Sequence, residues 1–385
     1  MIPVQQTLAG KQVVLGVTGS IAAVECVKLI HALRRKGAEV QVVMSDAAAG
    51  IVSPDALAYA SGRPAIIRIT GLVEHVTFCG DGGSAALLLI APCTANTISK
   101  IACGIDDTPV TTFATTAIGS GKPVLVVPAM HHSMFRHPGL TDNIERLENW
   151  GITVLSPRIE EGKAKIADID EIVLASERAV SERPLAGKRV LITSGPCREP
   201  VDDVRILTTR SSGMMGTALA LQAFRLGAEV TIVHGDTLPC VTNVNATTAE
   251  EMRDAVMSEL TARGGTDIYI SAAAISDFAP VQTEGKIRSG KPATIDLSPL
   301  PKLLDAVLDE YKPFTVAFKI DRNPLAPAKA LLKKGVSLVL MNQPETMGSR
   351  SGDYQLLSRK GTYRIAGTKD EIAAKVWEQV LREIR

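Results

Sequence analysis

The stretch QVVLGVTGSIAAVECVKLIHALRRKGAEVQVVM, residues 12–44, predicts how the first part of the chain folds. An apolar β-type run at Gln12–Val17 precedes a helical pattern over residues 21–36, which Gly37 closes. A second apolar run follows at Glu39–Met44. This is the rhythm of a β-α-β unit, in which a helix crosses between two parallel strands.

The same rhythm continues along the rest of the chain. Unbroken Val, Ile and Leu runs are typical of parallel strands that helices cover on both faces. Such runs predict further strands at residues 86–90, 123–127, 152–155, 189–193, 229–233, 267–271, 314–318 and 337–341, then β runs at 354–357 and 362–365. Helices are expected at residues 213–226 and from Lys369 onward. The charged, proline-containing segment 176–188 is the predicted linker between two domains.

Composition limits the classes of function that the chain can have. Its 385 residues are 45% hydrophobic, which is enough for packed cores in two domains. With 42 basic and 41 acidic residues the net charge is +1, so the chain lacks the broad positive footprint of a nucleic-acid binder. Neither a signal peptide nor an apolar run of about 20 residues, the length that spans a bilayer, is visible. Six scattered cysteines predict reduced thiols, and we expect a cytoplasmic protein without nucleic-acid or membrane partners.

Three loops that follow predicted strands in the first half carry small and polar residues. They are the turn GVTGS at residues 16–20, APCTANT at 91–97 and PAMHHSM at 128–134. Such loops at the carboxyl edge of a parallel sheet suit a phosphate or a polar ring. An ordinary tight turn between strand and helix explains the first loop equally well when it is taken alone.

Together with His75 and the stretch IDDT at residues 105–108, these loops resemble the homo-oligomeric flavin-containing cysteine decarboxylases over residues 10–170. The resemblance implies an FMN site and makes His75 the catalytic base while the flavin oxidises the cysteine thiol of the substrate, which then loses CO2. Imidazoles exchange protons near neutral pH, which suits this role. The residues implied for FMN binding are Gly19, Ser20, Ser45, Thr94, Asn96 and Thr97.

Two positions depart from the pattern of these decarboxylases. His131 stands where the family has the asparagine of Pro-Ala-Met-Asn, so recognition of the substrate carboxylate is expected from His131 or from its neighbour His132. The segment EEGKAK at residues 160–165 lacks the cysteine that many members carry there, and Lys165 falls near that place. Cys79 and Cys93 are alternatives for the final reduction if they lie near the flavin.

The second half resembles the phosphopantothenate-cysteine ligase domain. The resemblance rests on TSGPCREP at residues 193–200, DDVR at 202–205 and SSGMMG at 211–216. A Ser-Ser-Gly turn that opens a helix offers amides and hydroxyls to a phosphate, whereas a plain helix cap would explain Ser212 but not the block before it. The residues implied for nucleotide binding are Ser211, Ser212, Gly213, Ala273, Asp277, Lys286, Phe318 and Lys334.

The ligase resemblance also implies individual roles. Asp277 would read the cytosine nucleotide, and Lys286 would neutralise the triphosphate. Thr209 and Arg210 stand in place of the asparagine thought to stabilise the acyl-cytidylate, and either is expected to donate to the developing oxyanion.

A second helix lysine that normally accompanies Lys334 is replaced by Ala330. Lys329 and Lys333 are possible substitutes, and ordinary solvated lysines are the alternative.

Taken together, the chain is identified as a member of the bifunctional phosphopantothenoylcysteine decarboxylase/phosphopantothenate-cysteine ligases of coenzyme A biosynthesis. The expected fold is α/β, with two doubly wound Rossmann-like domains: a flavodoxin-like decarboxylase at residues 1–182 and a ligase-type domain at 183–385. The resemblance implies ligation of cysteine to 4'-phosphopantothenate with CTP and Mg2+ through an acyl-cytidylate, then FMN-dependent decarboxylation to 4'-phosphopantetheine. No metal-ligating side chains are predicted.

The partners implied are small-molecule substrates and further copies of the chain, with trimeric flavin domains and dimeric ligase domains. Two alternatives remain at this point. One is a ligase with a degenerate flavin domain, and the other is an FMN-binding regulatory subunit.

Overall fold

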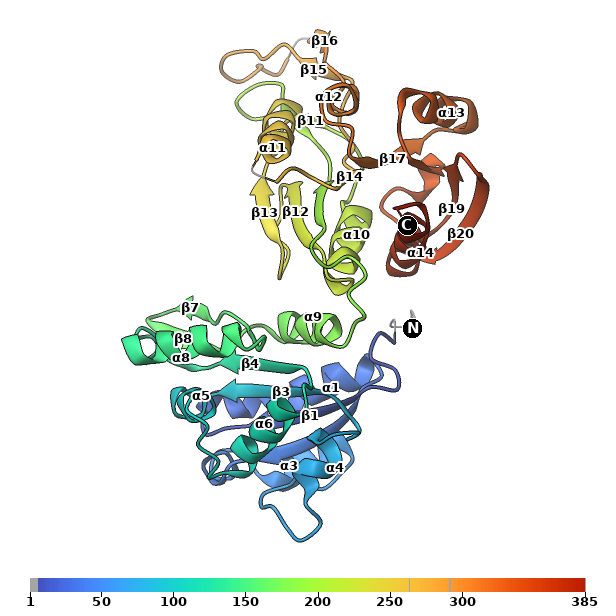
Figure 1. The fold of residues 1–385 in the computed structure, drawn as a ribbon. Coiled ribbons are helices and arrows are strands. Elements are labelled where there is room, and N and C mark those ends of the chain that lie inside the picture. Colours follow the sequence, from blue (N-terminus) through green and yellow to red (C-terminus); the bar gives the residue numbers. More distant parts are fainter. Residues whose placement is uncertain (1–5, 263, 291, 385) are drawn as a thin grey trace. The chain divides into compact units, whose positions relative to one another are not determined.

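The computed structural model describes residues 6–384 except residues 263 and 291. It divides into two compact units, Met1–Ser181 and Glu182–Arg385 (Figure 1). This division falls one residue before the predicted boundary. Each unit has a parallel sheet and hydrophobic clusters of its own.

The N-terminal unit is built on a parallel sheet with the strand order β2-β1-β3-β4-β6 in its described part. Its strands are β1 (Gln12–Val17), β2 (Glu39–Met44), β3 (Ala85–Cys93), β4 (Val124–Pro128) and β6 (Thr153–Val154). A smaller sheet contains β5 (Met130–His131), β8 (Lys163–Lys165) and β7 (Arg158–Glu160). The main order is that of flavodoxin-like folds, in which the strand sequence reverses between the first and third strands. The predicted fold class is confirmed for this unit.

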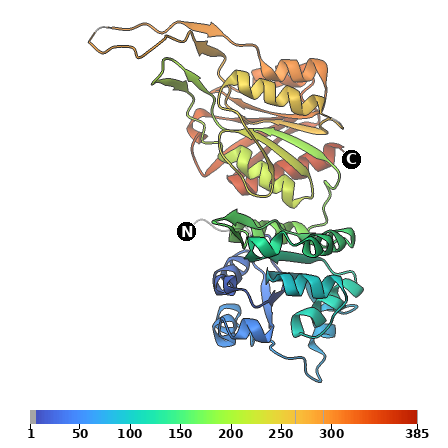
Figure 2. The same ribbon diagram turned by 90° about the vertical axis from the view of Figure 1, so that its left-hand side faces the viewer.

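Helices cover both faces of this sheet (Figure 2). They are η1 (Ile21–Glu25), α1 (Cys26–Arg35), α2 (Asp46–Ala49), α3 (Pro54–Ser61), α4 (Glu74–Cys79), α5 (Ala95–Ala102), α6 (Pro109–Gly119), α7 (His132–Phe135), α8 (Pro138–Asn149) and α9 (Ile169–Ala179). Val13 and Leu15 point into the cluster with α1 and α9, whereas Val14 belongs to the cluster with α5 and α6. Alternating side chains therefore serve two cores, which is why these strands read as unbroken apolar runs.

The predicted linker is shorter than the sequence suggested. Residues 176–179 form the last turn of α9, where Ser176 and Glu177 are buried. The Thr7 hydroxyl donates to the Glu177 carboxylate, and Lys36 Nζ lies 3.7 Å from it. A charged residue is tolerated inside the helix-sheet interface because its partners come from remote segments. The predicted helix over residues 21–36 also differs, since its first five residues form the 3-10 turn η1.

The C-terminal unit has the described strand order β13-β12-β9-β14-β17-β18-β19-β20. Its strands are β9 (Arg189–Thr193), β12 (Glu229–His234), β13 (Thr242–Asn245), β14 (Ile268–Ser271), β17 (Phe314–Ile320), β18 (Leu338–Asn342), β19 (Ser351–Ser358) and β20 (Gly361–Thr368). The first six are parallel and have the Rossmann order 3-2-1-4-5-6, while β19 and β20 are antiparallel. The predicted doubly wound fold is therefore confirmed here as well.

Two short hairpins and five helices complete the described part of this unit. The hairpin strands are β10 (Arg198–Pro200) with β11 (Ile206–Thr208), and β15 (Phe278–Pro280) with β16 (Leu297–Pro299). The helices are α10 (Met214–Arg225), α11 (Ala249–Thr261), α12 (Leu303–Glu310), α13 (Leu325–Lys334) and α14 (Lys369–Ile384), with the 3-10 turn η2 (Pro344–Thr346). Fully buried Trp377 joins α14 to α10, because its Nε1 donates to the Leu219 carbonyl over 2.9 Å.

Close packing between α10 and the end of β9 requires glycine at position 216. A Cβ atom at Gly216 would lie 2.5 Å from Ser194 Cβ. We predict that Gly216→Ala lowers the free energy of unfolding of the C-terminal unit by about 1–3 kcal/mol, as overpacking typically does. Denaturant titration followed by Trp377 fluorescence, in a Trp150→Phe background, measures this change.

Gly235→Ala is the matched control. Gly235 is exposed, and the nearest described neighbour of its added Cβ is Thr247 Cγ2 at 3.8 Å, an ordinary contact. Its effect is expected to stay within about 0.5 kcal/mol. Equal stabilities of the two variants would contradict the packing argument.

Candidate active sites

In the N-terminal unit, three neighbouring strands end in hydroxyl residues that cap the next helix. Ser20 follows β1 and accepts from the Ala22 amide at 3.4 Å. Ser45 follows β2, and Thr94 follows β3, and their hydroxyls likewise accept amides of the first helical turn. Because β1 lies between β2 and β3, all three caps meet at the carboxyl edge of the sheet, at its switch point. The structure therefore brings these predicted residues together.

Buried Thr18, which the sequence analysis did not single out, ties two of these loops together. Its hydroxyl donates to the Pro92 carbonyl over 2.8 Å and accepts from the Thr94 amide over 3.0 Å. The Ser45 amide donates to the Val17 carbonyl over 3.1 Å. The three loops are thus held by internal hydrogen bonds.

Gly19 is required at this edge because the loop after β1 nearly touches the first turn of α2, the helix that follows β2. A Cβ atom at position 19 would lie 2.5 Å from Ala47 Cβ. Real Cβ atoms do not approach this closely, so any larger residue must push the loop and α2 apart.

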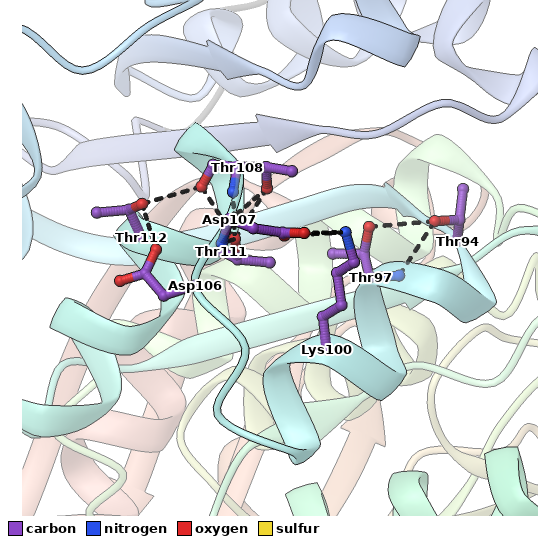
Figure 3. A network of polar contacts seen from close by, with 8 residues as sticks. All are labelled: Thr94, Thr97, Lys100, Asp106, Asp107, Thr108, Thr111 and Thr112. Atoms are coloured by element: carbon purple, nitrogen blue, oxygen red, sulfur yellow. Dashed lines mark hydrogen bonds and ion pairs between the residues drawn. The ribbon is translucent and has the colours of Figure 1, made fainter.

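A polar network holds α5 against the start of α6 (Figure 3). The hydroxyls of Thr94 and Thr97 lie 3.1 Å apart, and Lys100 Nζ lies 2.7 Å from the Asp107 carboxylate. Thr97 is buried and supports the Thr94 cap, whereas the Asn96 side chain is exposed. Among Thr94, Asn96 and Thr97, which are predicted to bind FMN, only Asn96 has an exposed side chain.

His75 lies on α4 with an unsatisfied ring nitrogen. Its Nδ1 is buried and has no hydrogen-bond partner among the described residues. Its ring stands edge-on to Phe113 of α6, with 6.5 Å between centroids. In the described part of the chain, no hydrogen bond links His75 to the capped loops after β1, β2 and β3.

The loop with His131 pairs with the segment that lacks the expected cysteine. In the pairing of β5 with β8, His131 lies opposite Lys163, and its Nδ1 is 3.0 Å from the Ser133 hydroxyl. The neighbouring His132 has a buried Nδ1 without a partner among the described residues. His131 and the 160–165 segment therefore belong to one small sheet, and His132, the first residue of α7, is joined to the turn of that segment by its amide, which donates to the Gly162 carbonyl over 3.3 Å.

Lys165 and the two alternative cysteines are poorly suited to the final reduction. Hydrogen bonds from Lys165 to Glu161 and then to Glu160, at 3.0 and 3.1 Å, raise the pKa of its ammonium group. Burial raises the pKa of Cys79 to about 12 and also raises the pKa of Cys93. Neither cysteine is therefore a ready thiolate at neutral pH.

The C-terminal unit contains a cavity of about 280 Å3 at the carboxyl ends of β14, β17 and β18. Five predicted nucleotide residues line it, namely Ser211, Ser212, Gly213, Ala273 and Phe318. Its remaining lining includes Asn342, Tyr354 and Lys369, which the sequence motifs did not indicate. The cavity thus combines the predicted Ser-Ser-Gly turn with a second set of polar side chains.

Backbone contacts continue past the strand ends beside this cavity. The Ala274 amide donates to the Gly195 carbonyl over 2.9 Å, extending the pairing of β9 with β14. The Ser194 hydroxyl donates to the Gly213 carbonyl over 3.1 Å and holds the Ser-Ser-Gly turn. This is the switch point of the sheet, where α/β proteins bind their ligands.

The other predicted ligase residues do not line the cavity. Arg210, Asp277 and Lys286 are exposed on loops, and Thr209 is half-buried. Lys334 is paired with Asp305 of α12, with Nζ 2.8 and 3.0 Å from the two carboxylate oxygens. The exposed lysines proposed as substitutes, Lys329 and Lys333, are likewise absent from the described lining.

A buried carboxylate anchors the loop that carries Lys286. Asp202 accepts from the Ile287 amide over 2.9 Å, from the amides of Val204 and Arg205, and from the Arg205 guanidinium. Burial by itself raises the pKa of Asp202, but these donors outweigh it and hold the pKa below its ordinary value. A local motif cannot show the bond to Ile287, because the two residues are 85 positions apart in the sequence.

The described residues contain neither a cluster of side chains that could hold a metal ion nor a helix that could span a membrane. No group of three or more His, Cys, Asp or Glu side chains in these residues is arranged to hold a metal ion. No helix among them is both long enough and apolar enough to cross a bilayer.

Both units of the chain are similar to known protein families. Residues 1–181 match the family described as Flavoprotein, and residues 185–384 match the DNA/pantothenate metabolism flavoprotein C-terminal domain. The coenzyme A biosynthesis bifunctional protein CoaBC of Thermococcus kodakarensis is 43% identical over 97% of this chain and 95% of its own length. The chain belongs to the CoaBC family. The CoaBC protein of Methanocaldococcus jannaschii is 34% identical over 98% of this chain and 95% of its own length.

Solved structures also match each part of this CoaBC-family chain. The C-terminal domain of a CoaBC protein is 29% identical and covers 53% of this chain and 98% of its own, with a TM-score of 0.45. The FMN-dependent cysteine decarboxylase SpaF is 26% identical and covers 45% of this chain and 99% of its own, with a TM-score of 0.41.

Family membership confirms the prediction of a bifunctional enzyme of coenzyme A biosynthesis. The two alternatives, a ligase alone or a regulatory subunit, are not favoured by matches that span both halves of CoaBC relatives.

Asp202→Asn is expected to reduce stability in a pH-dependent way. The native pKa of Asp202 is depressed, so its ionisation stabilises the fold fully above the unfolded pKa of about 3.9. This stabilisation is lost as the pH falls toward the native pKa. Thermal unfolding should show that the variant has a clearly lower melting temperature than the unmodified chain at pH 7. This difference should shrink below about pH 4.

Asp203→Asn is the control, because it removes the same charge from the exposed neighbouring residue. Its melting temperature is expected to stay close to that of the unmodified chain at every pH. A constant deficit of Asp202→Asn across this range would show that its contribution is not linked to ionisation.

Proposed function

We propose that the C-terminal unit is the phosphopantothenate-cysteine ligase and the N-terminal unit is the phosphopantothenoylcysteine decarboxylase. The ligase uses CTP and Mg2+ to join cysteine to 4'-phosphopantothenate through an acyl-cytidylate. The decarboxylase converts the product to 4'-phosphopantetheine with FMN. One observation carries the proposal: each unit gathers its predicted polar loops at a switch point of its own sheet.

The N-terminal residues fit a phosphorylated flavin. Ser20, Ser45 and Thr94 place hydroxyls and helix N-terminal amides at one edge, an arrangement that favours an anion and polar ring atoms. Gly19 lets the loops approach, and Asn96 presents an amide beside Thr94. When bound, FMN supplies the oxidising chemistry for the substrate thiol.

The histidines of this unit provide proton transfer and anion recognition. His75 acts as the base, and its partnerless Nδ1 supports this role because a buried polar atom requires a partner from elsewhere. His131, or His132 with its own partnerless Nδ1, takes the carboxylate of the substrate. The β7–β8 hairpin lies beside His131, because β8 pairs with β5.

In the ligase unit, the Ser-Ser-Gly turn at the start of α10 binds the phosphates, and Ala273 and Phe318 contact the nucleoside. Lys286 and Arg210 add positive charge from exposed loops, and Thr209 offers a hydroxyl to the oxyanion. Asp277 reads the base. Lys334 is the weakest of the proposed residues because Asp305 already neutralises it.

Exposed apolar side chains support the proposed homo-oligomers. On the hairpins of the ligase unit, Val204, Ile206 and Val281 are 64%, 55% and 59% exposed. In the decarboxylase unit, Tyr59 and Leu72 are 85% and 77% exposed. Large apolar side chains at the surface are candidates for subunit contacts, so dimeric ligase domains and trimeric flavin domains are part of the proposal. A cytoplasmic location is proposed as well.

The full-length chain should release pyrophosphate and CO2 when it receives 4'-phosphopantothenate, cysteine, Mg2+ and CTP. Other nucleoside triphosphates are tested in parallel. We expect His75→Asn to abolish CO2 release and leave pyrophosphate release intact. Lys286→Gln should abolish pyrophosphate release and leave intact the release of CO2 from added phosphopantothenoylcysteine, which is supplied here because this variant cannot make it.

His137→Asn is the control for the histidine, because asparagine can replace its helix cap on α8. Loss of both activities in either site variant would argue against separate sites. Failure of the unmodified chain to release pyrophosphate with any triphosphate would overturn the ligase assignment.

Gly19→Ala should weaken flavin binding about fivefold or more, because the added methyl group pushes the loop after β1 away from α2 at a typical overpacking cost of about 1–3 kcal/mol. The flavin-to-protein absorbance ratio after dilution measures this loss. Gly71→Ala is the control, since no described atom lies within 4 Å of its added Cβ. Unchanged flavin content in Gly19→Ala would remove this loop from the site.

A further inference from the structure

Three buried polar side chains from distant segments are part of the lining of the ligase cavity. Asn342 ends β18, Tyr354 lies on β19 and Lys369 opens α14. They are 6%, 3% and 8% exposed. The antiparallel return through β19 and β20 brings Lys369 back beside the parallel strands.

Lys369 lacks a carboxylate partner among the described residues. Its Nζ hydrogen-bonds to the Tyr354 hydroxyl and lies 4.8 Å from the centroid of that ring. The nearby Glu371 carboxylate is occupied by the amide and hydroxyl of Thr368, at 2.7 and 3.1 Å, and Asp370 is exposed. A buried ammonium group without a counter-charge is costly, so an anionic ligand would relieve that cost.

Asn342 complements this cation with an unused acceptor. Its Nδ2 donates to Thr346 Oγ1 over 2.6 Å, while the Thr346 hydroxyl donates to the Gln343 carbonyl. This chain of donors determines the orientation of the amide. Its Oδ1 is therefore the atom left buried without a partner, at a typical cost of about 1–3 kcal/mol.

We propose that Lys369, positioned by Tyr354, is the counter-charge for the phosphate chain of the nucleoside triphosphate, and that Asn342 Oδ1 accepts an N–H or O–H group of the same nucleotide. The proposal rests on the ligase function proposed above. The same cavity is lined by the first turn of the twelve-residue helix α10, whose dipole also favours phosphate. A triphosphate with a sugar and a base matches both the cation and the free acceptor.

The test compares variants of the full-length chain by calorimetric titration with CTP and with inorganic tripolyphosphate. Lys369→Met should bind both at least tenfold more weakly, because it keeps the side-chain length but removes the charge. Lys375→Met removes the same charge from the exposed face of α14 and should bind both as the unmodified chain does. Decarboxylation of added phosphopantothenoylcysteine should be unaffected in either variant.

Asn342→Leu separates the two parts of the proposal. Tripolyphosphate carries no N–H donor and few O–H donors at pH 8, so its affinity should be unchanged, whereas CTP should bind several-fold more weakly. Equal effects on both ligands would overturn the role of Asn342. Loss of CTP affinity but not of tripolyphosphate affinity in Lys369→Met would overturn the phosphate assignment of Lys369.

Tyr354→Phe tests the same proposal if Lys369→Met fails to fold, because it removes only the hydroxyl to which Nζ is hydrogen-bonded. We expect several-fold weaker binding of both ligands. Affinities within twofold of the unmodified chain in folded Lys369→Met or in Tyr354→Phe would overturn the proposal. If the unmodified chain itself neither binds CTP nor releases pyrophosphate, the ligase function fails instead.

Discussion

Parallel pairing at the switch points, β1 with β3 and β9 with β14, is the constraint on which both sites depend. At each pair the strand order reverses. The helices that follow the two strands therefore pack on opposite faces of the sheet, and the loops that lead into them diverge. Hydrogen bonds continue past the strand ends, from the Thr94 amide to the Thr18 hydroxyl and from the Ala274 amide to the Gly195 carbonyl. The loops are therefore positioned by the sheet rather than by a ligand.

The two proposed sites offer different groups to an anion. The N-terminal edge uses neutral hydroxyl caps and helix amides, which suit a single phosphate and a polar ring. The C-terminal cavity adds a buried ammonium, that of Lys369, and more negative charge is expected on a triphosphate than on a flavin phosphate. Small residues are essential in both, since Gly19 and Gly216 stand where a Cβ atom would collide with a neighbouring loop.

Errors of sequence-based prediction share one physical cause. The segment 176–188 looked like a linker because Glu177 is charged, yet Thr7 and Lys36 allow it to be buried. The role of Lys334 stays a prediction, but its ion pair with Asp305 of another helix is likewise a contact that no motif shows. A motif specifies residue type and order, whereas the direction of a long side chain is set by partners elsewhere in the fold.

The sequence by itself determined the two α/β halves, the glycine-serine turns and the family. Buried parallel strands read as apolar runs, and tight turns demand small residues, so both leave local signals. Only the tertiary structure decided which polar groups share a cavity. Asn342, Tyr354 and Lys369 meet because β19 and β20 run back along the sheet, and such long-range pairing leaves no mark in any short stretch of residues.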